Sequence, residues 1–328
     1  MVGDFEQMLA VYGHVGEDPS VFADSQAAHL VIHENRVIGA HLVPGLVVEP
    51  DEMADGVRVR VCVREGAQLR NPVHLCFGVL PEAGLQRILL DVTAEPRSRV
   101  TLQAHCVFPN ALDVTHEMEA DIRIAEDARY TYFERHVHGP AGGVVVVPRA
   151  RVTLAPRASF ETEFELLEGR VGRMDIDYEA RCREHSSLRM VARMSGSDDD
   201  EIRIREVAHL QGPGAAGVLL SRIAVKDDAR ADVYNELTAS APHAVGHVDC
   251  KEIVMDRAIA RATPIVDVRH PLARVTHEAS IGSVDSRQME TLMARGLTEE
   301  DAVDMIVRAM LSPARRAQEP ASETRRTS

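Results

Sequence analysis

Hydrophobic residues alternate with polar residues through the middle of the chain. In the stretch VRVRVCV, the valines at Val57, Val59, Val61 and Val63 fall on one face of a strand. The same period of two recurs in ADIRIAEDARYTYFER, VVVVPRARVTLAPRASF and EIRIREVAHL, and it continues to about residue 280. The pattern predicts a mainly β protein whose core covers residues 57–280.

Short turns of the form small residue, any residue, apolar residue recur between these strands. Seven can be aligned, with separations of 31, 30, 30, 28, 43 and 44 residues: Ala67, Ser98, Ala128, Ala158, Ser186, Ala229 and Ala273. A step near 30 is typical of stacked solenoid coils, and we interpret the two longer steps as insertions. A sandwich or barrel would place its turns about 8 to 12 residues apart, so the spacing favours a β-helix.

Helical periodicity appears only near the two ends of the chain. Between Asp4 and Tyr12, apolar residues lie on one helical face, at Phe5, Met8, Leu9 and Tyr12. This predicts an N-terminal segment, residues 1–56, with one short helix.

Two further helices are expected in residues 281–312. The first follows Asp285 and ends at Gly296, and its apolar face carries Met289, Leu292 and Met293. Thr298 and Asp301 form a capping box that starts the second. The apolar stripe of this helix is Val303, Ile306, Val307, Met310 and Leu311, and Pro313 ends it. Such a hairpin either caps its own core or docks a partner, and a polar, disordered tail is expected at residues 313–328.

Composition narrows the possible partners. The 328 residues carry 51 acidic and 37 basic side chains, a formal charge of −14, which argues against nucleic acid. No apolar run approaches the roughly 20 residues of a membrane span, and the first residues do not resemble a secretory signal, so we expect a cytoplasmic protein. The five cysteines form no CxxC pair, which indicates free thiols.

Most local motifs are weak. The chain has no GxxxxGK[ST] or GxGxxG phosphate loop, so nucleotide binding by this chain is not expected. His136 and His138 in RHVHG share one strand face, as metal ligands must, but no third ligand at a suitable spacing is evident. Exposed or hydrogen-bonded histidines are the simpler interpretation of that pair.

Cys250, His277 and Glu278 make a better set. Cys250 and His277 are 27 residues apart, close to one coil, so stacking could place them at neighbouring heights. Thiolate, imidazole and carboxylate ligands together suit iron or zinc. Because adjacent strand residues point to opposite faces, Cys250 can share a site with His277 or Glu278 but hardly with both, unless a bulge lies here or one of the pair works across an interface.

At these residues the chain resembles the SufB and SufD proteins of the SUF iron–sulfur cluster assembly system. The resemblance covers roughly residues 60–312 and is sharpest in VTHEASIGSVDSRQMETLMARGLTEEDAVDMIVRAML. It implies a right-handed parallel β-helix with a helical C-terminal domain. SufB proteins, unlike SufD, have a cysteine about one coil before the HE pair, and Cys250, His277 and Glu278 match that pattern. The CxxC-type motif of many longer SufB proteins is missing, so no ligand role passes to Cys62 or Cys76.

The resemblance implies a scaffold rather than an enzyme. A transient iron–sulfur cluster would be held at a subunit interface by Cys250 with Glu278 or His277. A SufC-type ABC ATPase would bind the C-terminal helices, through Met289, Leu292, Met293, Ile306 and Met310. The chain would pair with itself, as compact archaeal SufB-like proteins could, or with a SufB/SufD-like protein, and would meet a sulfur donor and apo-protein acceptors.

Two other functions are alternatives. The first is a SufD-like adaptor that binds the ATPase and a sister subunit without carrying a cluster, and the Cys250 set argues against it. The second is a β-helix carbohydrate-active enzyme, which the absence of Trp and the 4% aromatic content disfavour.

Overall fold

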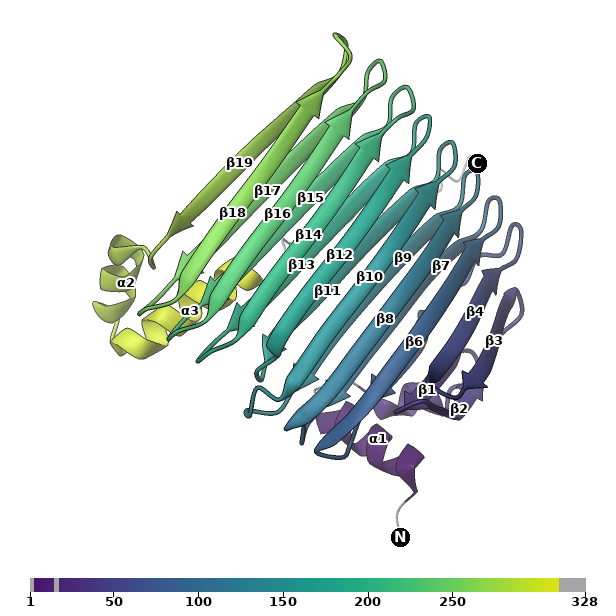
Figure 1. The fold of residues 1–328 in the computed structure, drawn as a ribbon, viewed down its shortest axis with the longest axis horizontal. Coiled ribbons are helices and arrows are strands. Elements are labelled where there is room, and N and C mark those ends of the chain that lie inside the picture. The colour runs from purple at the N-terminus through teal and green to yellow at the C-terminus, as the bar shows by residue number, and fades with distance from the viewer. Residues whose placement is uncertain (1–2, 15–17, 313–328) are drawn as a thin grey trace, which may run out of the picture. The chain divides into compact units, whose positions relative to one another are not determined.

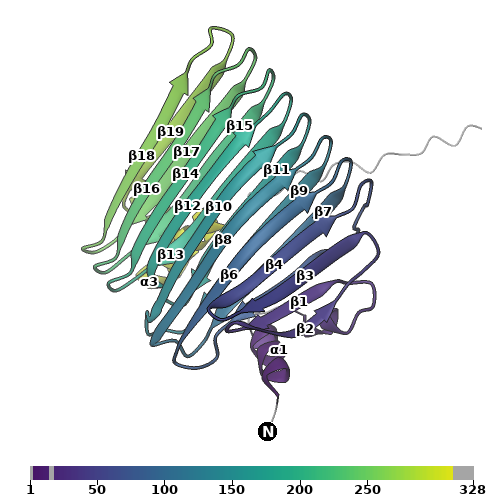
Figure 2. The same cartoon turned by 45° about the vertical axis from the view of Figure 1, so that its right-hand side comes forward.

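The computed structural model describes residues 3–14 and 18–312. They belong to two compact units, and the boundary along the chain falls between Val284 and Asp285. The first unit is the solenoid (Figures 1 and 2). Its ten-stranded sheet, named sheet A, runs in the order β19-β17-β15-β13-β11-β9-β7-β5-β1-β2, and its nine-stranded sheet, sheet B, in the order β18-β16-β14-β12-β10-β8-β6-β4-β3. Successive strands of the chain from β4 onward therefore alternate between the two sheets, as a β-helix requires.

The strands of sheet A are β1 (His29–His33), β2 (Arg36–His41), β5 (Val73–Gly78), β7 (Arg99–Phe108), β9 (Arg129–His138), β11 (Ser159–Glu168), β13 (Ser187–Gly196), β15 (Ala216–Val225), β17 (Val245–Val254) and β19 (Arg274–Gly282). Those of sheet B are β3 (Leu46–Met53), β4 (Gly56–Val63), β6 (Ala83–Ala94), β8 (Asp113–Ile124), β10 (Val144–Leu154), β12 (Gly172–Cys182), β14 (Glu201–Leu210), β16 (Arg230–Ala239) and β18 (Ile259–Val268). All pairings are parallel except β1 with β2 and β3 with β4. The predicted parallel β-helix is confirmed.

One continuous apolar core lies between the two sheets. Alternate residues of most strands are buried, so Val57, Val59, Val61 and Val63 all point inward as the pattern predicted. The core is aliphatic over most of its length, which suits coils that stack the same residue type one above the other. The alternating hydrophobic and polar residues of the sequence therefore point alternately into the core and toward the outer face.

Helix α1 (Asp4–His14) and the 3₁₀ helix η1 (Pro19–Phe22) cover the outer face of the first strands of sheet A. Met8 and Tyr12 are fully buried and pack with Val31, Cys76 and Val107 of sheet A. The predicted N-terminal helix is confirmed and reaches two residues further than expected. The segment before residue 57 also supplies β1, β2 and β3, whose hairpins begin the two sheets.

The turn ladder is more regular than the sequence indicated. Backbone hydrogen bonds join the successive turns of sheet A, including Ala216 N to Ser186 O, Val245 N to Ala215 O and Arg274 N to Ala244 O. The ladder therefore runs through Ala67, Ser98, Ala128, Ala158, Ser186, Ala215, Ala244 and Ala273, in steps of 31, 30, 30, 28, 29, 29 and 29. The predicted insertions were wrong, because Ala229 belongs to the matching turn of sheet B, half a coil away.

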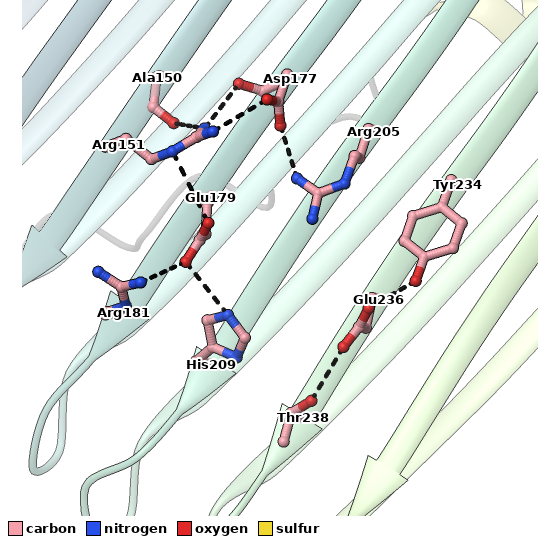
Figure 3. Close-up of polar contacts among 10 residues, drawn as sticks. All are labelled: Ala150, Arg151, Asp177, Glu179, Arg181, Arg205, His209, Tyr234, Glu236 and Thr238. Atoms are coloured by element: carbon pink, nitrogen blue, oxygen red, sulfur yellow. Dashed lines mark hydrogen bonds and ion pairs between the residues drawn. The ribbon is translucent and has the colours of Figure 1, made fainter.

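The outer face of sheet B carries rows of polar side chains (Figure 3). Asp177 of β12 accepts hydrogen bonds from Arg151 of β10 at 3.0 Å and from Arg205 of β14 at 2.7 Å. One strand position further, Glu179 contacts Arg181 at 2.7 Å. Such exposed pairs hold neighbouring coils in register but contribute little free energy each.

The second unit contains helices α2 (Ser286–Met293) and α3 (Glu299–Leu311), which lie against each other. Asp285 caps α2, and the Thr298 hydroxyl accepts a hydrogen bond from Asp301 N at 3.1 Å, as the capping box predicted. The predicted disordered tail, residues 313–328, lies outside the described residues. None of the helices in the described ranges is long and apolar enough to cross a bilayer.

Candidate functional site

Cys250 lies on the inner face of β17, one coil before the last strand of sheet A. Its side chain is fully buried. The register places it opposite Ser221 of β15 on one side and Ala279 of β19 on the other. The side chains paired with Cys250 on the two neighbouring strands are therefore both small.

The register separates His277 from Glu278. Val248 is paired with His277 and Asp249 with Glu278. His277 therefore shares the inward side of the sheet with Cys250, about 8 Å away at the Cα positions given the spacings of a parallel sheet. Glu278 is on the outer side, where its carboxylate lies 3.5 Å from Lys251 Nζ. No bulge interrupts β17 and β19, so the geometry brings Cys250 to the side of His277 and not of Glu278.

Both members of the HE pair are exposed, whereas Cys250 is not. β19 is the outermost strand of sheet A, so no further coil pairs with its free edge within the described part of the chain. The last coil thus presents an imidazole beside a buried thiol at an open end of the stack.

Polar side chains that the sequence analysis did not single out surround Cys250. The Asn235 amide lies between Cys250 and Glu206. One end of the amide is 3.6 Å from Cys250 Sγ, and the other end is 3.3 Å from Glu206 Oε2. Ser221 lies beside the thiol, and Glu252 points inward two residues along β17. The alternation of β17 alone predicted an inward Glu252, while the Asn235 contact comes from the opposite sheet and had no local signal.

Burial dominates the electrostatics of this group. It raises the pKa of the Cys250 thiol above its usual value, with Ser221 opposing the effect. It also raises the pKa of Glu252 to about 7 and that of Glu206 to about 8. At neutral pH Glu206 is therefore mostly protonated and Glu252 about half protonated, and the thiol is held in its neutral form unless a cation binds it.

His136 and His138 are hydrogen-bonded, as one of the two simpler interpretations had it, but they are core residues and not exposed. Both are buried on the inner face of β9, and Cys106, His116 and Glu134 lie around them. The expectation that no further ligand accompanies the pair was wrong. Cys106 is 30 residues before His136, one coil, and this spacing was the available signal.

These features define a class of protein: a parallel β-helix with a buried cysteine one coil from an exposed HE pair, followed by a helical hairpin. Residues 82–310 match the family model described as SUF system FeS cluster assembly, SufBD core domain. The chain belongs to the SufBD family.

Three similar proteins come from archaea. An iron-sulfur cluster assembly SufBD family protein of Methanocaldococcus jannaschii is 32% identical over 305 residues, which is 93% of this chain and 96% of the relative. One from Pyrococcus horikoshii is 33% identical over 310 residues, 94% of each chain. A third, from Methanothermobacter thermautotrophicus, is 26% identical over 252 residues, 76% of this chain and 61% of the relative. The first two show that this compact length recurs within the family.

Proposed function

We propose that this chain is the scaffold subunit of an iron–sulfur cluster assembly complex, works with a SufC-type ATPase and passes the nascent cluster to apo-proteins. The observation that supports this most directly is the register of the last coil, which puts the His277 imidazole on the same side as the Cys250 thiol. Family membership supplies the link to cluster assembly. Thiolates hold clusters firmly, and a nitrogen or oxygen ligand in place of a thiolate suits a cluster that must leave.

The last coil can supply only part of the ligands for a cluster. β18 and β19 are the outermost strands of their sheets, and exposed apolar side chains lie on them, including Ile259, Val268 and Ile281. Unpaired strand edges with apolar side chains favour pairing with another chain. A second copy or a SufB/SufD-like subunit docked there would complete the site, with Glu278 contributing from the outer side.

Anaerobic reconstitution with iron and sulfide tests the scaffold assignment. Wild type is expected to take up iron and develop visible cluster absorption, and Cys250→Ala to lose both. Cys182→Ala is the matched control, because Cys182 is equally buried in the same solenoid but is distant in sequence from the last coil. Equal cluster content in wild type and Cys250→Ala would overturn the ligand assignment.

The ATPase is proposed to bind the helical hairpin. Met293 is exposed on α2, and Met289, Leu292, Ile306 and Met310 are half-buried. Asp substitutions at Met289 and Met293 are expected to abolish co-purification with a SufC-type subunit. Met305→Asp is the control, since Met305 is equally exposed on α3 but is not part of the predicted docking set. Equal loss with both variants would argue against a specific surface.

A SufD-like adaptor is the second candidate, and one observation favours it. Cys250 is fully buried and burial raises its pKa, whereas reactive cysteines are partly exposed and have a lowered pKa. An adaptor would still bind the ATPase and a sister subunit. Absence of a cluster in wild type reconstituted with its ATPase, together with intact complex formation, would favour this role.

A further inference from the structure

The middle of the solenoid contains a second set of metal-ligating side chains, unrelated in position to Cys250. Cys106 of β7 and His136 of β9 are paired in register, and Glu134 precedes His136 by two residues on the same face. His116 reaches the group from β8 in the opposite sheet. One ligand atom from each of these four residues lies within 4.8 Å of the others, and all four side chains are buried.

The individual contacts have the spacing of ligands around one small ion. Cys106 Sγ is 3.9 Å from His116 Nε2 and 3.7 Å from Glu134 Oε1, and Glu134 Oε1 is 2.8 Å from His136 Nε2. Zinc has bonds of about 2.0 to 2.3 Å to nitrogen, oxygen and sulfur ligands, so tetrahedral ligands lie roughly 3 to 4 Å from each other. The four donors therefore need only small shifts to surround a cation.

A chain of hydrogen bonds fixes the protonation of His136. The Arg170 carbonyl can only accept, so His138 donates from Nδ1 to Arg170 O, 3.2 Å away. Neutral His138 then has a bare Nε2, which accepts from His136 Nδ1 at 3.2 Å. His136 Nε2 is consequently a bare lone pair that faces Glu134. This is the second-sphere arrangement that orients a metal-bound histidine.

The carboxylate of Glu134 also indicates a cation site. A bare nitrogen and an ionised carboxylate oxygen at 2.8 Å would repel each other, so a metal ion or a proton must lie between them. The other oxygen of Glu134 is buried without a hydrogen-bond partner among the described residues. Buried polar atoms are rarely left unsatisfied, and a buried carboxylate oxygen without a hydrogen bond is suited to bind a cation.

Charge and packing also suit a divalent ion. A thiolate from Cys106 and a carboxylate from Glu134 balance two positive charges, while the histidines stay neutral, so the loaded site has no net charge to bury. Phe164 stacks on His136 with ring centroids 4.6 Å apart, and Phe108 lies 5.2 Å from His116. These rings exclude water from the donors.

We propose that Cys106, His116, Glu134 and His136 form a tetrahedral site for one borderline divalent transition-metal ion, Zn²⁺ or Fe²⁺, inside the solenoid. The mixed sulfur, nitrogen and oxygen donors suit these ions and not Mg²⁺ or Ca²⁺. Binding releases the protons of Cys106 and Glu134 and places the ion between Glu134 and His136, whose donor atoms move slightly apart to the spacing of tetrahedral ligands. Because the site is sealed, the ion enters while the chain folds.

Cobalt(II) is the probe, since tetrahedral cobalt with a thiolate ligand gives visible bands and a near-ultraviolet charge-transfer band. The full chain with Cys250→Ala is unfolded and refolded anaerobically with CoCl₂, so that the thiol of the proposed cluster site cannot contribute. We expect about one equivalent of cobalt per chain in this protein, and displacement of the bands by ZnCl₂. This outcome does not depend on whether the chain assembles clusters.

Two variants in the same background locate the ion. Cys106→Ala should lose the charge-transfer band, and Cys182→Ala should keep it. His138→Phe removes only the second-sphere partner and should weaken cobalt binding about 10- to 100-fold. A refolded Cys250→Ala protein without stoichiometric cobalt would show that only a proton bridges Glu134 and His136. A charge-transfer band that survives Cys106→Ala would show that another cysteine binds the cobalt, and would overturn the proposed site. If Cys106→Ala does not refold, the His138→Phe titration decides.

Discussion

Cys106 and Cys250 occupy the same kind of position, an inward-facing residue of sheet A, yet their surroundings differ. Cys106 has coils above and below it, and its neighbouring donors are all buried. Cys250 is one coil from the end, and the imidazole nearest to it in register is exposed. A closed stack can pre-form a complete ligand set, whereas an open end leaves a set that a second subunit must finish.

The electrostatics of the two regions are similar. Around Cys106, burial lowers the pKa of both His116 and His136 to about 3 and raises that of Glu134 to about 7. Near Cys250, burial likewise raises the pKa of Glu206 and Glu252. The two regions thus differ less in the polarity of their inner residues than in access from outside.

The largest expected effect concerns the buried carboxyl of Glu206, which lies next to the Asn235 amide. Its pKa is raised from 4.5 to about 8 on folding, so the unfolded chain ionises first as pH rises. The contribution of Glu206 to the free energy of unfolding is fully present below pH 4.5. It falls as pH rises from 4.5 to 8, by roughly 4 kcal/mol in total. Glu206→Gln should flatten the free energy of unfolding over this window in urea titrations. Parallel pH profiles for variant and wild type would show that Glu206 is hydrated.

His136→Ala and His277→Ala compare the closed and open regions directly. Removing the buried ring should leave a cavity and unpaired partners, at a cost of about 2 to 4 kcal/mol in the free energy of unfolding. Removing the exposed ring should change it by less than about 0.5 kcal/mol. Urea midpoints of the metal-free proteins measure both. Similar losses would mean that the last coil is covered in solution, for instance by a second copy.

Leucine substitutions at two alanines of the turn ladder test how tightly neighbouring coils enclose each turn. Ala215 is fully buried between coils, and Ala273 occupies the same rung in the last coil. Overpacking should cost about 1 to 3 kcal/mol for Ala215→Leu, and less for Ala273→Leu because its outer side is open. Thermal unfolding of the two variants provides the comparison, and a greater loss at Ala273 would contradict it.

The smallest effect is expected for Lys251→Ala. Its ion pair with Glu278 lies on the outer face, and the Glu278 side chain is 61% exposed. Exposed pairs contribute about 0 to 1 kcal/mol, so stability should be almost unchanged. If Glu278 serves the proposed cluster, iron retention should respond to Glu278→Ala but not to Lys251→Ala, a contrast that iron analysis after reconstitution would reveal.

The sequence predicts what depends on local periodicity and misses what depends on contacts between sheets. Alternation identified the strands, and capping residues such as Thr298 identified the helices. The ladder position Ala229 was assigned to the wrong sheet because both sheets have the same turn type, half a coil apart. His116 and Asn235 reach their partners across the core, and no spacing along the chain encodes that meeting.

Because the turns of the ladder recur at nearly constant spacing, the distance along the solenoid increases by a nearly fixed amount with each coil. Four strand-to-strand steps separate β9 from β17 in sheet A, which is about 19 Å at the spacing of a parallel sheet. Removing or adding one coil of 29 residues would change that separation by about 5 Å while leaving the residues of both thiol regions intact. The length of the stack could therefore be adjusted to the reach of a partner without redesigning either end.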